Sequence, residues 1–429
     1  MSSELKKIRP VSRIEAEVRL PGSKSITHRA LMMSALSEGP AEISNPLRAE
    51  DTLLTARALE TLGAEVEWSA GSVRVVPPAF RWRQPHGAVF LGNSGTSARL
   101  LLPVFSVGTG AFLMDGTPRL RERPVGPAAQ CLEKLGVQVR WLGKPGFLPL
   151  EIESRGIEGG DLFVDASKSS QFLSGILIAA PCARGPVVVE WSEPTASRPY
   201  VDITLGMMKE AGIRFDYQAS SRISIPAPQA YALRNFTVEG DCSSASYFWG
   251  AAALTGGEVL TSPVSPGSLQ GDRRFLDVLE KMGCRIEWKS EGVLVKGPDR
   301  LLPVDVDMNE MPDMVPTLAV LGAFANGISR IRNVGHLRIK ESDRLHSVAA
   351  GLEVLGIEAE ELPDGLIIHG ERRRMRPPLG PVSAFGDHRI AMSFALAGLR
   401  MEGVAIEGAE SVGKSFPEFW DVFDRLAEG

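Results

Sequence analysis

The chain has 429 residues, of which 44% are hydrophobic and 23% are charged, with a formal net charge of -5. This length predicts two or three domains, each large enough to bury a core, and the mild acidity gives no electrostatic reason to expect nucleic acid. No apolar run is long enough for a membrane-spanning helix, and the opening MSSELKKIRP lacks the apolar segment of a secretory signal. Four cysteines without CxxC spacing favour a reducing cytoplasm and argue against structural zinc.

The stretch LPGSKSITHR, residues 20–29, is the first with a functional pattern. A Pro-Gly pair interrupts the preceding strand pattern, and a helix pattern begins at Ser23. Lys24, Arg29 and several hydroxyl groups lie in the first turns, where backbone N–H groups have no partner within the helix. Such a helix start suits a phosphate or carboxylate group, although a capped helix with solvated charges would give the same pattern.

An internal repeat organises the rest of the chain. A helix pattern that ends in Leu-Gly or a close variant, followed by an alternating strand pattern, recurs along the sequence. The closing glycines have regular spacing and are Gly63, Gly136, Gly212, Gly283, Gly356 and Gly429. Each glycine is expected to stop its helix in a left-handed conformation before the chain turns back as a strand.

A second set of helix patterns alternates with the first. These helices begin at Ser23, Ser94, Ser169, Ser243, Pro312 and His388. Several are apolar on nearly all sides, which predicts buried helices. The unit is strand, helix, strand, helix, strand, strand, about 73 residues long. Six such units predict an α/β protein with two domains, in each of which three units surround a pseudo-threefold axis with helices inside and sheets outside. The last helix is predicted to start at Lys414.

The domain boundaries follow from dividing the repeats three and three. We expect the first domain to span residues 20–239 and the second to combine residues 1–19 with residues 240–429, with the active site in the cleft between them. The first strand, residues 5–19, then belongs to the second domain. The Pro- and Arg-rich stretch at residues 371–380 is predicted to be a solvated loop.

The predicted helix starts are rich in polar groups. Serines and aspartates there are often only helix caps, but a cation in a first turn opposes the helix dipole, so Lys24, Lys168 and Arg389 require anionic partners. Further cations lie in the runs RERP, residues 121–124, and RIKESDR, residues 338–344. By itself, a mixed run such as RIKESDR is more often a solvated helix face than a site.

Several common catalytic motifs are missing from the sequence. No His, Cys, Asp or Glu group has metal-ligand spacing, and GxSxG, GxGxxG and GxxxxGK[ST] do not occur in the expected settings. The remaining inventory of cations, hydroxyl groups and a few carboxylates favours acid–base chemistry on small, multiply anionic substrates, with no metal and no cofactor.

Motifs along nearly the whole chain resemble, in order, the 5-enolpyruvylshikimate-3-phosphate synthase family. They are LPGSKSITHRA, FLGNSGT, RERPVG, SSQFLSGILIAAP, SRPYVDITL, VEGDCSSASYF, GDRRFLDVLEKMG, MPDM, RIKESDRL, GDHRIAM and KSFPEFW. The resemblance implies two domains of three βαβαββ units each, forming an inverse α/β barrel that closes over the substrates. It also implies a monomeric, cytoplasmic transferase of the shikimate pathway, which leads to chorismate and the aromatic amino acids.

The implied reaction transfers the enolpyruvyl group of phosphoenolpyruvate to the 5-hydroxyl of shikimate 3-phosphate and releases phosphate through a tetrahedral intermediate. By similarity, shikimate 3-phosphate would be bound by Lys24, Ser25, Arg29, Ser169, Ser170, Gln171, Ser197, Asp313, His336 and Lys340. Phosphoenolpyruvate would be bound by Lys24, Asn93, Gly95, Arg123, Gln171, Arg344, Arg389 and Lys414. Asp313 and Glu341 resemble the proton-transfer pair, and Lys24 is a competing proton donor.

This chemistry requires these residue types. Addition to the enol ether needs a base at the attacking hydroxyl and an acid at the methylene carbon, and elimination needs the methyl proton to leave again. Asp313 is expected to be the ionised base. Glu341 would alternate between acid and base, although the flanking Lys340 and Arg344 favour its charged form. Arginines suit carboxylates and phosphates because they form paired hydrogen bonds with them.

Three positions depart from the family pattern. His336 stands where the family often has asparagine, near the hydroxyl groups of the sugar acid. Ser94 stands where alanine is usual, and Lys168, in place of a neutral residue, is expected to add a phosphate contact. Gly95 is retained, and because a small residue there leaves room for glyphosate in this family, we expect sensitivity to that inhibitor.

Two other functions fit parts of this pattern. The UDP-N-acetylglucosamine enolpyruvyl transferase shares the fold but carries a reactive cysteine in the loop that corresponds to residues 116–124, which contain none here. The second alternative is a non-catalytic anion-binding scaffold, or an RNA-end-binding protein of related repeat fold. The presence of both Asp313 and Glu341, together with the net charge of -5, argues against it.

Overall fold

The structure is a computed structural model that describes residues 4–79, 82–370 and 377–426. Within those ranges, no helix combines the length and the apolar composition needed to cross a membrane. Two sequence predictions fall partly or wholly outside the described residues. They are the solvated loop at residues 371–380, of which only the last four residues are described, and the closing glycine Gly429.

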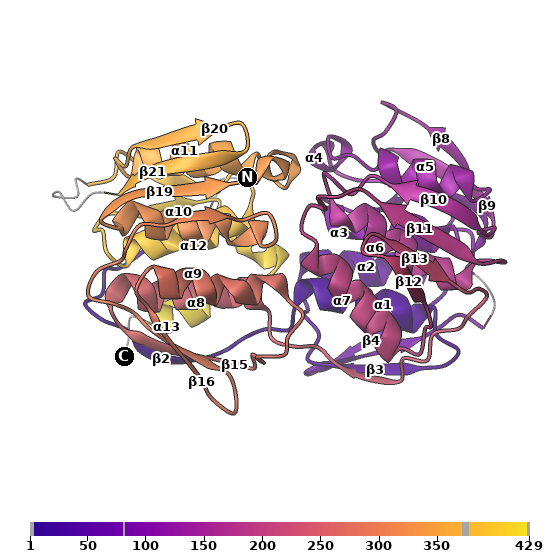
Figure 1. The fold of residues 1–429 in the computed structure, drawn as a ribbon, viewed down its shortest axis with the longest axis horizontal. Coiled ribbons are helices and arrows are strands. Elements are labelled where there is room, and N and C mark those ends of the chain that lie inside the picture. Colours follow the sequence, from indigo (N-terminus) through magenta and orange to yellow (C-terminus); the bar gives the residue numbers. More distant parts are fainter. Residues whose placement is uncertain (1–3, 80–81, 371–376, 427–429) are drawn as a thin grey trace. The chain divides into compact units, whose positions relative to one another are not determined.

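The chain forms two compact units (Figure 1). The central unit is Gly22–Val238, and the terminal unit combines Met1–Pro21 with Glu239–Gly429. Each unit contains three of the six repeats, and each is described here by itself. The predicted cleft site between the domains stays a prediction.

The central unit contains repeats one to three. Repeat one comprises α1 (Lys24–Ala35), β3 (Ala41–Ser44), α2 (Glu50–Thr61), β4 (Glu65–Ser69) and β5 (Ser72–Val76). Repeat two comprises β6 (Val89–Phe90), α3 (Gly95–Phe105), β7 (Thr109–Asp115), α4 (Pro118–Arg121), α5 (Gly126–Lys134), β8 (Gln138–Trp141) and β9 (Leu150–Arg155). Repeat three comprises β10 (Gly160–Val164), α6 (Ser170–Ala179), the 3₁₀ helix η1 (Ala180–Cys182), β11 (Val187–Trp191), α7 (Pro199–Glu210), β12 (Asp216–Ala219) and β13 (Arg222–Ile225), and β14 (Asn235–Thr237) follows.

The terminal unit contains the first two strands and repeats four to six. The first strands are β1 (Leu5–Lys7) and β2 (Glu15–Arg19). Repeat four comprises α8 (Cys242–Thr255), β15 (Glu258–Ser262), the 3₁₀ helix η2 (Gly271–Arg274), α9 (Phe275–Lys281), β16 (Arg285–Trp288) and β17 (Val293–Lys296). Repeat five comprises β18 (Asp305–Asp307), η3 (Pro312–Met314), α10 (Val315–Phe324), β19 (Gly327–Arg332), η4 (Gly335–Ile339), α11 (Arg344–Val354), β20 (Ala359–Leu362) and β21 (Gly365–Gly370). Repeat six comprises β22 (Val382–Ser383), α12 (His388–Gly398), β23 (Ala405–Glu407), η5 (Ala409–Lys414) and α13 (Phe419–Arg425).

The four-stranded sheets of the described residues share one topology. A first strand pairs in parallel with a second, and the second pairs antiparallel with one strand of a hairpin, as in the order β10-β11-β13-β12. The same order appears in both units. A smaller, three-stranded sheet has β1 in place of the hairpin, in the order β1-β23-β22. The recurring pattern follows from the repeats in the sequence.

Besides the sheet that β1 joins, two four-stranded sheets are completed by strands from distant parts of the sequence. β2 pairs in parallel with β15, with Val18 opposite Thr261. β14 pairs in parallel with β3, with Phe236 opposite Ile43. β2 therefore belongs to a sheet of the terminal unit, whereas β14 completes the sheet of the first repeat in the central unit. The chain passes from one unit to the other after β2 and again after β14.

The glycines that close the first set of helices adopt the predicted positive φ. The angle is 102° at Gly63, 85° at Gly136, 83° at Gly212, 100° at Gly283 and 73° at Gly356. A residue with a Cβ atom would be strained in this conformation. The regular glycine spacing in the sequence therefore marks the points at which these helices end.

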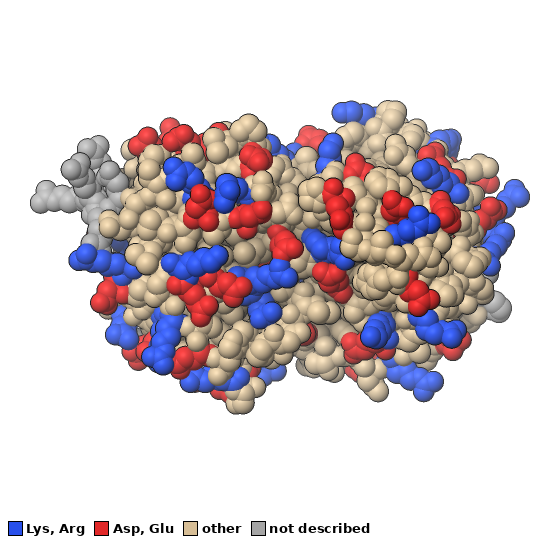
Figure 2. Space-filling view, in the orientation of Figure 1, with Lys and Arg blue, Asp and Glu red and all other residues tan. Residues whose placement is uncertain are grey.

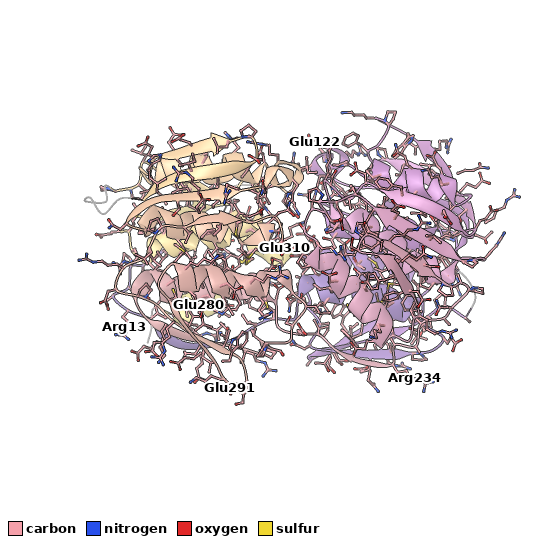
Figure 3. The ribbon with its side chains drawn as sticks, viewed as in Figure 1. Arg13, Glu122, Arg234, Glu280, Glu291 and Glu310 are labelled. Carbon is pink, nitrogen blue, oxygen red and sulfur yellow. The ribbon has the colours of Figure 1, made fainter. Side chains whose placement is uncertain are left out.

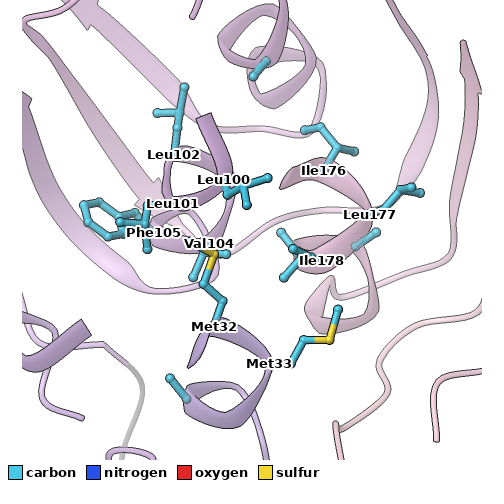
Figure 4. Close-up of a cluster of buried hydrophobic side chains, with 14 of the residues drawn as sticks. Met32, Met33, Leu100, Leu101, Leu102, Val104, Phe105, Ile176, Leu177 and Ile178 are labelled. Atoms are coloured by element: carbon cyan, nitrogen blue, oxygen red, sulfur yellow. The ribbon is translucent and has the colours of Figure 1, made fainter. Parts of the chain in front are cut away.

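The second set of helices forms the core of each unit. In the central unit, side chains of α1, α3 and α6 converge, among them Met32, Leu101 and Ile178 (Figure 4). In the terminal unit every residue of α8 is buried, and α10 packs against β21 (Figure 1). Burial of one such Leu or Ile side chain stabilises a fold by about 1.5–3 kcal/mol. The prediction of buried helices is confirmed.

Charged side chains of both signs are interspersed on the face shown in Figure 2. Arg13, Arg234 and Glu291 are exposed and lie at the outer edge of the ribbon (Figure 3). On that face, groups of one sign lie next to groups of the other. We therefore examine the helix starts for closely grouped cations.

The last helix begins later than predicted. α13 starts at Phe419, and Lys414 instead ends η5. Pro417 lies between them, and because proline lacks an N–H group and restricts the residue before it, one continuous helix cannot form. Lys414 is nevertheless buried, with 4% of its surface exposed.

Candidate active site

An ion pair marks the start of α1. Ser23 is the N-cap residue, Lys24 is the first residue of the helix, and the Lys24 ammonium lies 3.2 Å from Oδ2 of Asp51. Asp51 is in the first turn of α2, and both side chains are buried. The carboxylate supplies the anionic partner that a lysine at this position requires. The alternative of a capped helix with solvated charges is therefore wrong.

The start of α3 is in close contact with Arg123. This buried side chain donates a hydrogen bond from Nη1 to the carbonyl oxygen of Asn93 at 3.0 Å. A Cβ atom at Gly95 would lie 2.3 Å from the guanidinium carbon of Arg123. Glycine therefore lets the guanidinium group approach the first turn of α3. The structure brings the predicted residues Asn93, Gly95 and Arg123 together.

The start of α6 is connected to α3 through Gln171. Its side chain accepts a hydrogen bond from Nη1 of Arg99 at 3.0 Å and donates one to Oγ1 of Thr96 at 2.9 Å. Ser169 caps α6 by accepting the backbone N–H of Gln171, and Ser170 is the buried first residue of the helix. These bonds fix the predicted residues of the α6 start against α3.

Arg29 ties three helices of the central unit together. Its guanidinium group donates to the hydroxyl oxygens of Thr204 and Ser174 and to the carbonyl oxygens of Ser25 and Tyr200. Burial lowers the pKa of Arg29 to about 10. Arginine carries five N–H donors, and these bonds engage most of them. The structure thus gives Arg29 a packing role, and its contact with a substrate stays a prediction.

Two other predicted residues of the central unit lie outside helices. Ser197 is buried and has a φ of 57°, a strained conformation that is common at binding sites. Lys168 is exposed and precedes the N-cap residue of α6. The prediction that Lys168 stands in a first helical turn and requires an anionic partner is therefore wrong, because the helix begins two residues later.

Arg344 gathers three carboxylates in the terminal unit. Its Nη1 lies 2.7 Å from Asp313 Oδ1, its Nη2 lies 2.9 Å from Glu341 Oε2, and its Nε lies 2.7 Å from Asp387 Oδ2. The Arg344 side chain is only 2% exposed. Although burial opposes the shift, the carboxylates raise the pKa of Arg344 above its ordinary value. Within the run RIKESDR, Glu341 and Arg344 are thus buried while Arg338 and Asp343 are partly exposed, so the interpretation of the whole run as a solvated helix face is wrong.

Asp313 is shared by two arginines. Its Oδ2 lies 2.8 Å from Nη2 of Arg389, while its Oδ1 binds Arg344. Asp313 lies in η3, which leads into α10, and Arg389 lies in the first turn of α12, where Asp387 accepts its backbone N–H. The anionic partner that Arg389 requires is therefore Asp313. The Asp313 side chain is 17% exposed, so a small ligand can reach it.

A further buried carboxyl group belongs to the same unit. Asp272 lies in η2 and accepts a hydrogen bond from Oγ of Ser243 at 2.6 Å. Burial and the neighbouring charge of Asp313 raise the pKa of Asp272 to about 6, against the opposing effect of Arg389. This carboxyl group therefore titrates closer to neutrality than an exposed aspartate does.

His336, predicted as a substrate residue, is held neutral by its surroundings. It lies in η4, and burial together with the charge of Lys340 lowers its pKa to about 3. In the described part of the chain, its Nε2 has no hydrogen-bond partner. A neutral imidazole has one donor and one acceptor nitrogen, so His336 can form hydrogen bonds with a polar ligand without adding charge.

Replacing His336 by asparagine is expected to reduce the acid sensitivity of the fold. The unfolded chain binds a proton at this residue near pH 6.5, whereas the folded chain does so only near pH 3, so stability is lost as pH falls between these values. His336 alone contributes about 2 kcal/mol to the loss of the wild type between pH 6.5 and pH 5. Urea unfolding at the two pH values should show a smaller loss for the variant.

His346 provides the matched control, since its side chain is 63% exposed. A His346→Asn variant should lose as much stability in acid as the wild type. Equal losses in the wild type and both variants would contradict the assigned pKa shift of His336.

Comparison with known proteins identifies the family. The EPSP synthase (3-phosphoshikimate 1-carboxyvinyltransferase) family matches residues 8–423. The chain is 57% identical over 421 residues to the 3-phosphoshikimate 1-carboxyvinyltransferase of Syntrophobacter fumaroxidans, covering 98% of this chain and 99% of that protein. It is 39% identical over 429 residues to the protein of the same name from Sulfurovum sp., with 98% of each covered. The chain belongs to the EPSP synthase family.

A solved EPSP synthase from Acinetobacter baumannii has the same fold. It matches with a TM-score of 0.81 at 30% identity, covering 98% of both chains. The predicted fold class, a two-domain inverse α/β barrel of six repeats with buried helices, is confirmed. The predicted family and the prediction of an enzyme are confirmed as well.

Sequence reasoning missed several residues of the site in this member of the EPSP synthase family. Asp51 and Asp387 were not predicted as site residues, although both lie at helix starts beside required cations. Charge balance is the signal that would have found them. The sequence carries no such signal for Asp272. It carries none for Tyr247 either, whose hydroxyl lies 3.4 Å from Nη1 of Arg389.

Proposed function

We propose that this chain transfers the enolpyruvyl group of phosphoenolpyruvate to the 5-hydroxyl of shikimate 3-phosphate, with release of phosphate, in the pathway to chorismate and the aromatic amino acids. Membership of the EPSP synthase family supports this function. The observation that carries the chemistry is the Arg344 centre, where one buried guanidinium group orients two carboxylates, Asp313 and Glu341.

The terminal unit supplies the base in this proposal. Asp313 accepts the proton of the 5-hydroxyl, and its bonds to Arg344 and Arg389 favour its ionised form. The same arginines, with the buried Lys414, would bind the carboxylate and phosphate groups of phosphoenolpyruvate. His336, neutral and partly buried, would contact shikimate 3-phosphate, as would Lys340.

The central unit supplies further anion contacts. Lys24, Arg123 and Asn93 would bind phosphoenolpyruvate, and Gln171 lies at the start of α6, from which contacts to both substrates are proposed. The hydroxyl and guanidinium groups proposed for shikimate 3-phosphate are those of Ser25, Arg29, Ser169, Ser170 and Ser197. The space beside Gly95 is taken by the Arg123 guanidinium group, and sensitivity to glyphosate stays a prediction.

The proposed reaction proceeds by addition and elimination. In the addition, the 5-oxygen of shikimate 3-phosphate bonds to C2 of phosphoenolpyruvate, Asp313 takes the hydroxyl proton, and an acid gives a proton to C3. In the elimination, the C3 methyl group loses a proton and the bond from C2 to the phosphate oxygen breaks. The Lys24 ammonium carries a proton to give, whereas Glu341, bound to Arg344, is suited to accept one. Lys24 is therefore the proposed proton donor of the addition, and Glu341 the proposed proton acceptor of the elimination.

We also propose that the helix starts of the two units act on one pair of substrates. The support is chemical, since neither set alone contains all the groups that the reaction needs. The central unit contributes Lys24 and Arg123, and the terminal unit contributes the carboxylates at Arg344. Much of the rate would come from holding both substrates in place. A monomeric state and a cytoplasmic location stay predictions.

Phosphate release provides the test. The purified chain is mixed with phosphoenolpyruvate and one of three additions: shikimate 3-phosphate, UDP-N-acetylglucosamine, or buffer alone. We expect phosphate release only with shikimate 3-phosphate. Release with the nucleotide sugar would favour the other enolpyruvyl transferase, and binding of shikimate 3-phosphate without any release would favour a non-catalytic scaffold.

A further inference from the structure

A buried hydrogen bond lies one helical turn below the Lys24–Asp51 ion pair. His28 follows Lys24 by four residues in α1, and Thr55 follows Asp51 by four residues in α2, so each lies on the same helix face as its ion-pair neighbour. Nδ1 of His28 lies 2.8 Å from Oγ1 of Thr55. The first two turns of α1 and α2 are therefore joined twice, once by charge and once by this bond.

The hydrogen bonds continue into α3. Oγ1 of Thr55 lies 2.8 Å from Oγ of Ser97, which lies 2.7 Å from Oγ of Ser94. Ser94 is the N-cap residue of α3 and accepts the backbone N–H of Ser97 at 3.3 Å. The side chains of all four residues, His28 included, are fully buried. Water therefore does not compete for these bonds, which strengthens them relative to bonds at a surface.

The last member of this chain of bonds stands inside the proposed anion-binding turn. Ser94 lies between Asn93, whose carbonyl oxygen binds Arg123, and Gly95, which lies against the Arg123 guanidinium group. Ser94 connects these two residues, so bonds that fix its side chain restrict the conformation of the turn. The geometry of this turn therefore depends on what holds Ser94.

We propose that Ser94, Ser97, Thr55 and His28 form a positioning relay that holds the Asn93–Gly95 turn and Arg123 in place for the anionic groups of phosphoenolpyruvate. The proposal rests on the proposed function. The relay residues act through the turn and do not themselves contact substrate.

The relay has a consistent direction. If Nδ1 of His28 accepts the Thr55 hydroxyl, then Thr55 accepts from Ser97 and Ser97 accepts from Ser94. Each hydroxyl then donates once within the relay, and the carbonyl oxygen of Asp51, 3.3 Å from Oγ of Ser97, is a more distant acceptor than Thr55 for the Ser97 hydroxyl. The oxygen of Ser94 then keeps lone pairs for the backbone N–H of Ser97, which is the cap that begins α3.

The test compares variants of the relay by two measurements on the full chain. The Kd of phosphoenolpyruvate is measured by calorimetric titration without acceptor, and the KM of each substrate is measured by phosphate release. Thr55→Val removes the central hydroxyl and nearly keeps the side-chain shape. We expect it to raise the Kd and KM of phosphoenolpyruvate about tenfold, the effect of one lost buried hydrogen bond, and to leave the KM of shikimate 3-phosphate within twofold.

A conservative pair at position 28 separates positioning from simple packing. Asparagine places an acceptor oxygen close to the position of Nδ1, so His28→Asn should keep the Kd near the wild-type value. His28→Leu offers no acceptor and should behave like Thr55→Val. The comparison of these two His28 variants also tests the relay if Thr55→Val does not fold. An equal Kd in the two His28 variants would overturn the relay.

Ser154→Ala is the matched control. Ser154 is a buried hydroxyl at the other end of α3, where it donates to the carbonyl oxygen of Ser106 at 2.7 Å. This variant should lower Tm without changing the Kd of phosphoenolpyruvate. If Thr55→Val likewise lowers only Tm, or weakens both substrates equally, the relay is wrong. If the wild type binds phosphoenolpyruvate but transfers no enolpyruvyl group, the proposed function is wrong. The Kd values of the variants would still test the relay.

Discussion

Replacing Arg344 by methionine is expected to destabilise the chain by about 3–5 kcal/mol. The substitution removes the guanidinium group that Asp313, Glu341 and Asp387 share. Asp387 is fully buried, so it cannot recover the lost interaction from water. Methionine keeps an unbranched apolar stem, which limits the loss of packing. Urea unfolding at pH 7 measures the effect, and acidification should reduce it, since protonated carboxyl groups no longer require a cation.

Arg338 offers a matched comparison in the same unit. It also pairs with two carboxylates, those of Asp343 and Glu361, but its side chain is 29% exposed. Solvent screens such a pair, so Arg338→Met should cost less than about 1 kcal/mol. If both methionine variants lose the same amount of stability, the Arg344 centre is not the buried electrostatic core described above.

Replacing Asp313 by asparagine is expected to lower kcat by about 10²–10⁴-fold. Asparagine keeps the shape of the side chain and one acceptor oxygen for the arginines, but it cannot take a proton from the 5-hydroxyl. The Kd of shikimate 3-phosphate, measured by calorimetry, should rise by less than about tenfold, because only one of many contacts changes. Steady-state phosphate release gives kcat.

Asp343→Asn is the control for this substitution. Asp343 caps α11 and pairs with Arg338, and asparagine is an equally good N-cap residue. Its kcat should stay close to that of the wild type. A normal kcat in Asp313→Asn would remove Asp313 as the base. A loss of shikimate 3-phosphate binding as large as the loss of kcat would assign Asp313 to binding.

The sequence predicted the features that depend on local rules. Positive φ at Gly63 and its equivalents follows from the need to end a helix and reverse the chain, and a repeated glycine reveals this without a structure. The buried helices followed from apolar residues on all sides, as α8 illustrates. Ser94 and Ser169 were recognisable as helix-start residues, and both prove to be N-caps.

Tertiary contacts were harder to predict, because they join residues far apart in the chain. The bond from Arg344 to Asp387 joins residues 43 positions apart, and no sequence pattern near either residue predicts it. Lys168 lies two residues and Lys414 five residues before the helix to which each was assigned, since propensity alone does not locate a helix end within a few residues. Arg29 matched a binding motif, but its bonds to Thr204 and other groups came only from the packing of α1 against α6 and α7.

The pairing of β2 with β15 also has a consequence for how the chain is made. Val18 leaves the ribosome before any of the central unit, yet its partner Thr261 is synthesised only after that unit is complete. The central unit receives its closing strand β14 earlier and can fold as an insertion within an unfinished neighbour. A fragment that starts at Glu239 would leave the edge of β15 unpaired, so that a strand of another chain could add to it. A peptide of residues 1–21 contains β2, the strand that covers this edge in the whole chain.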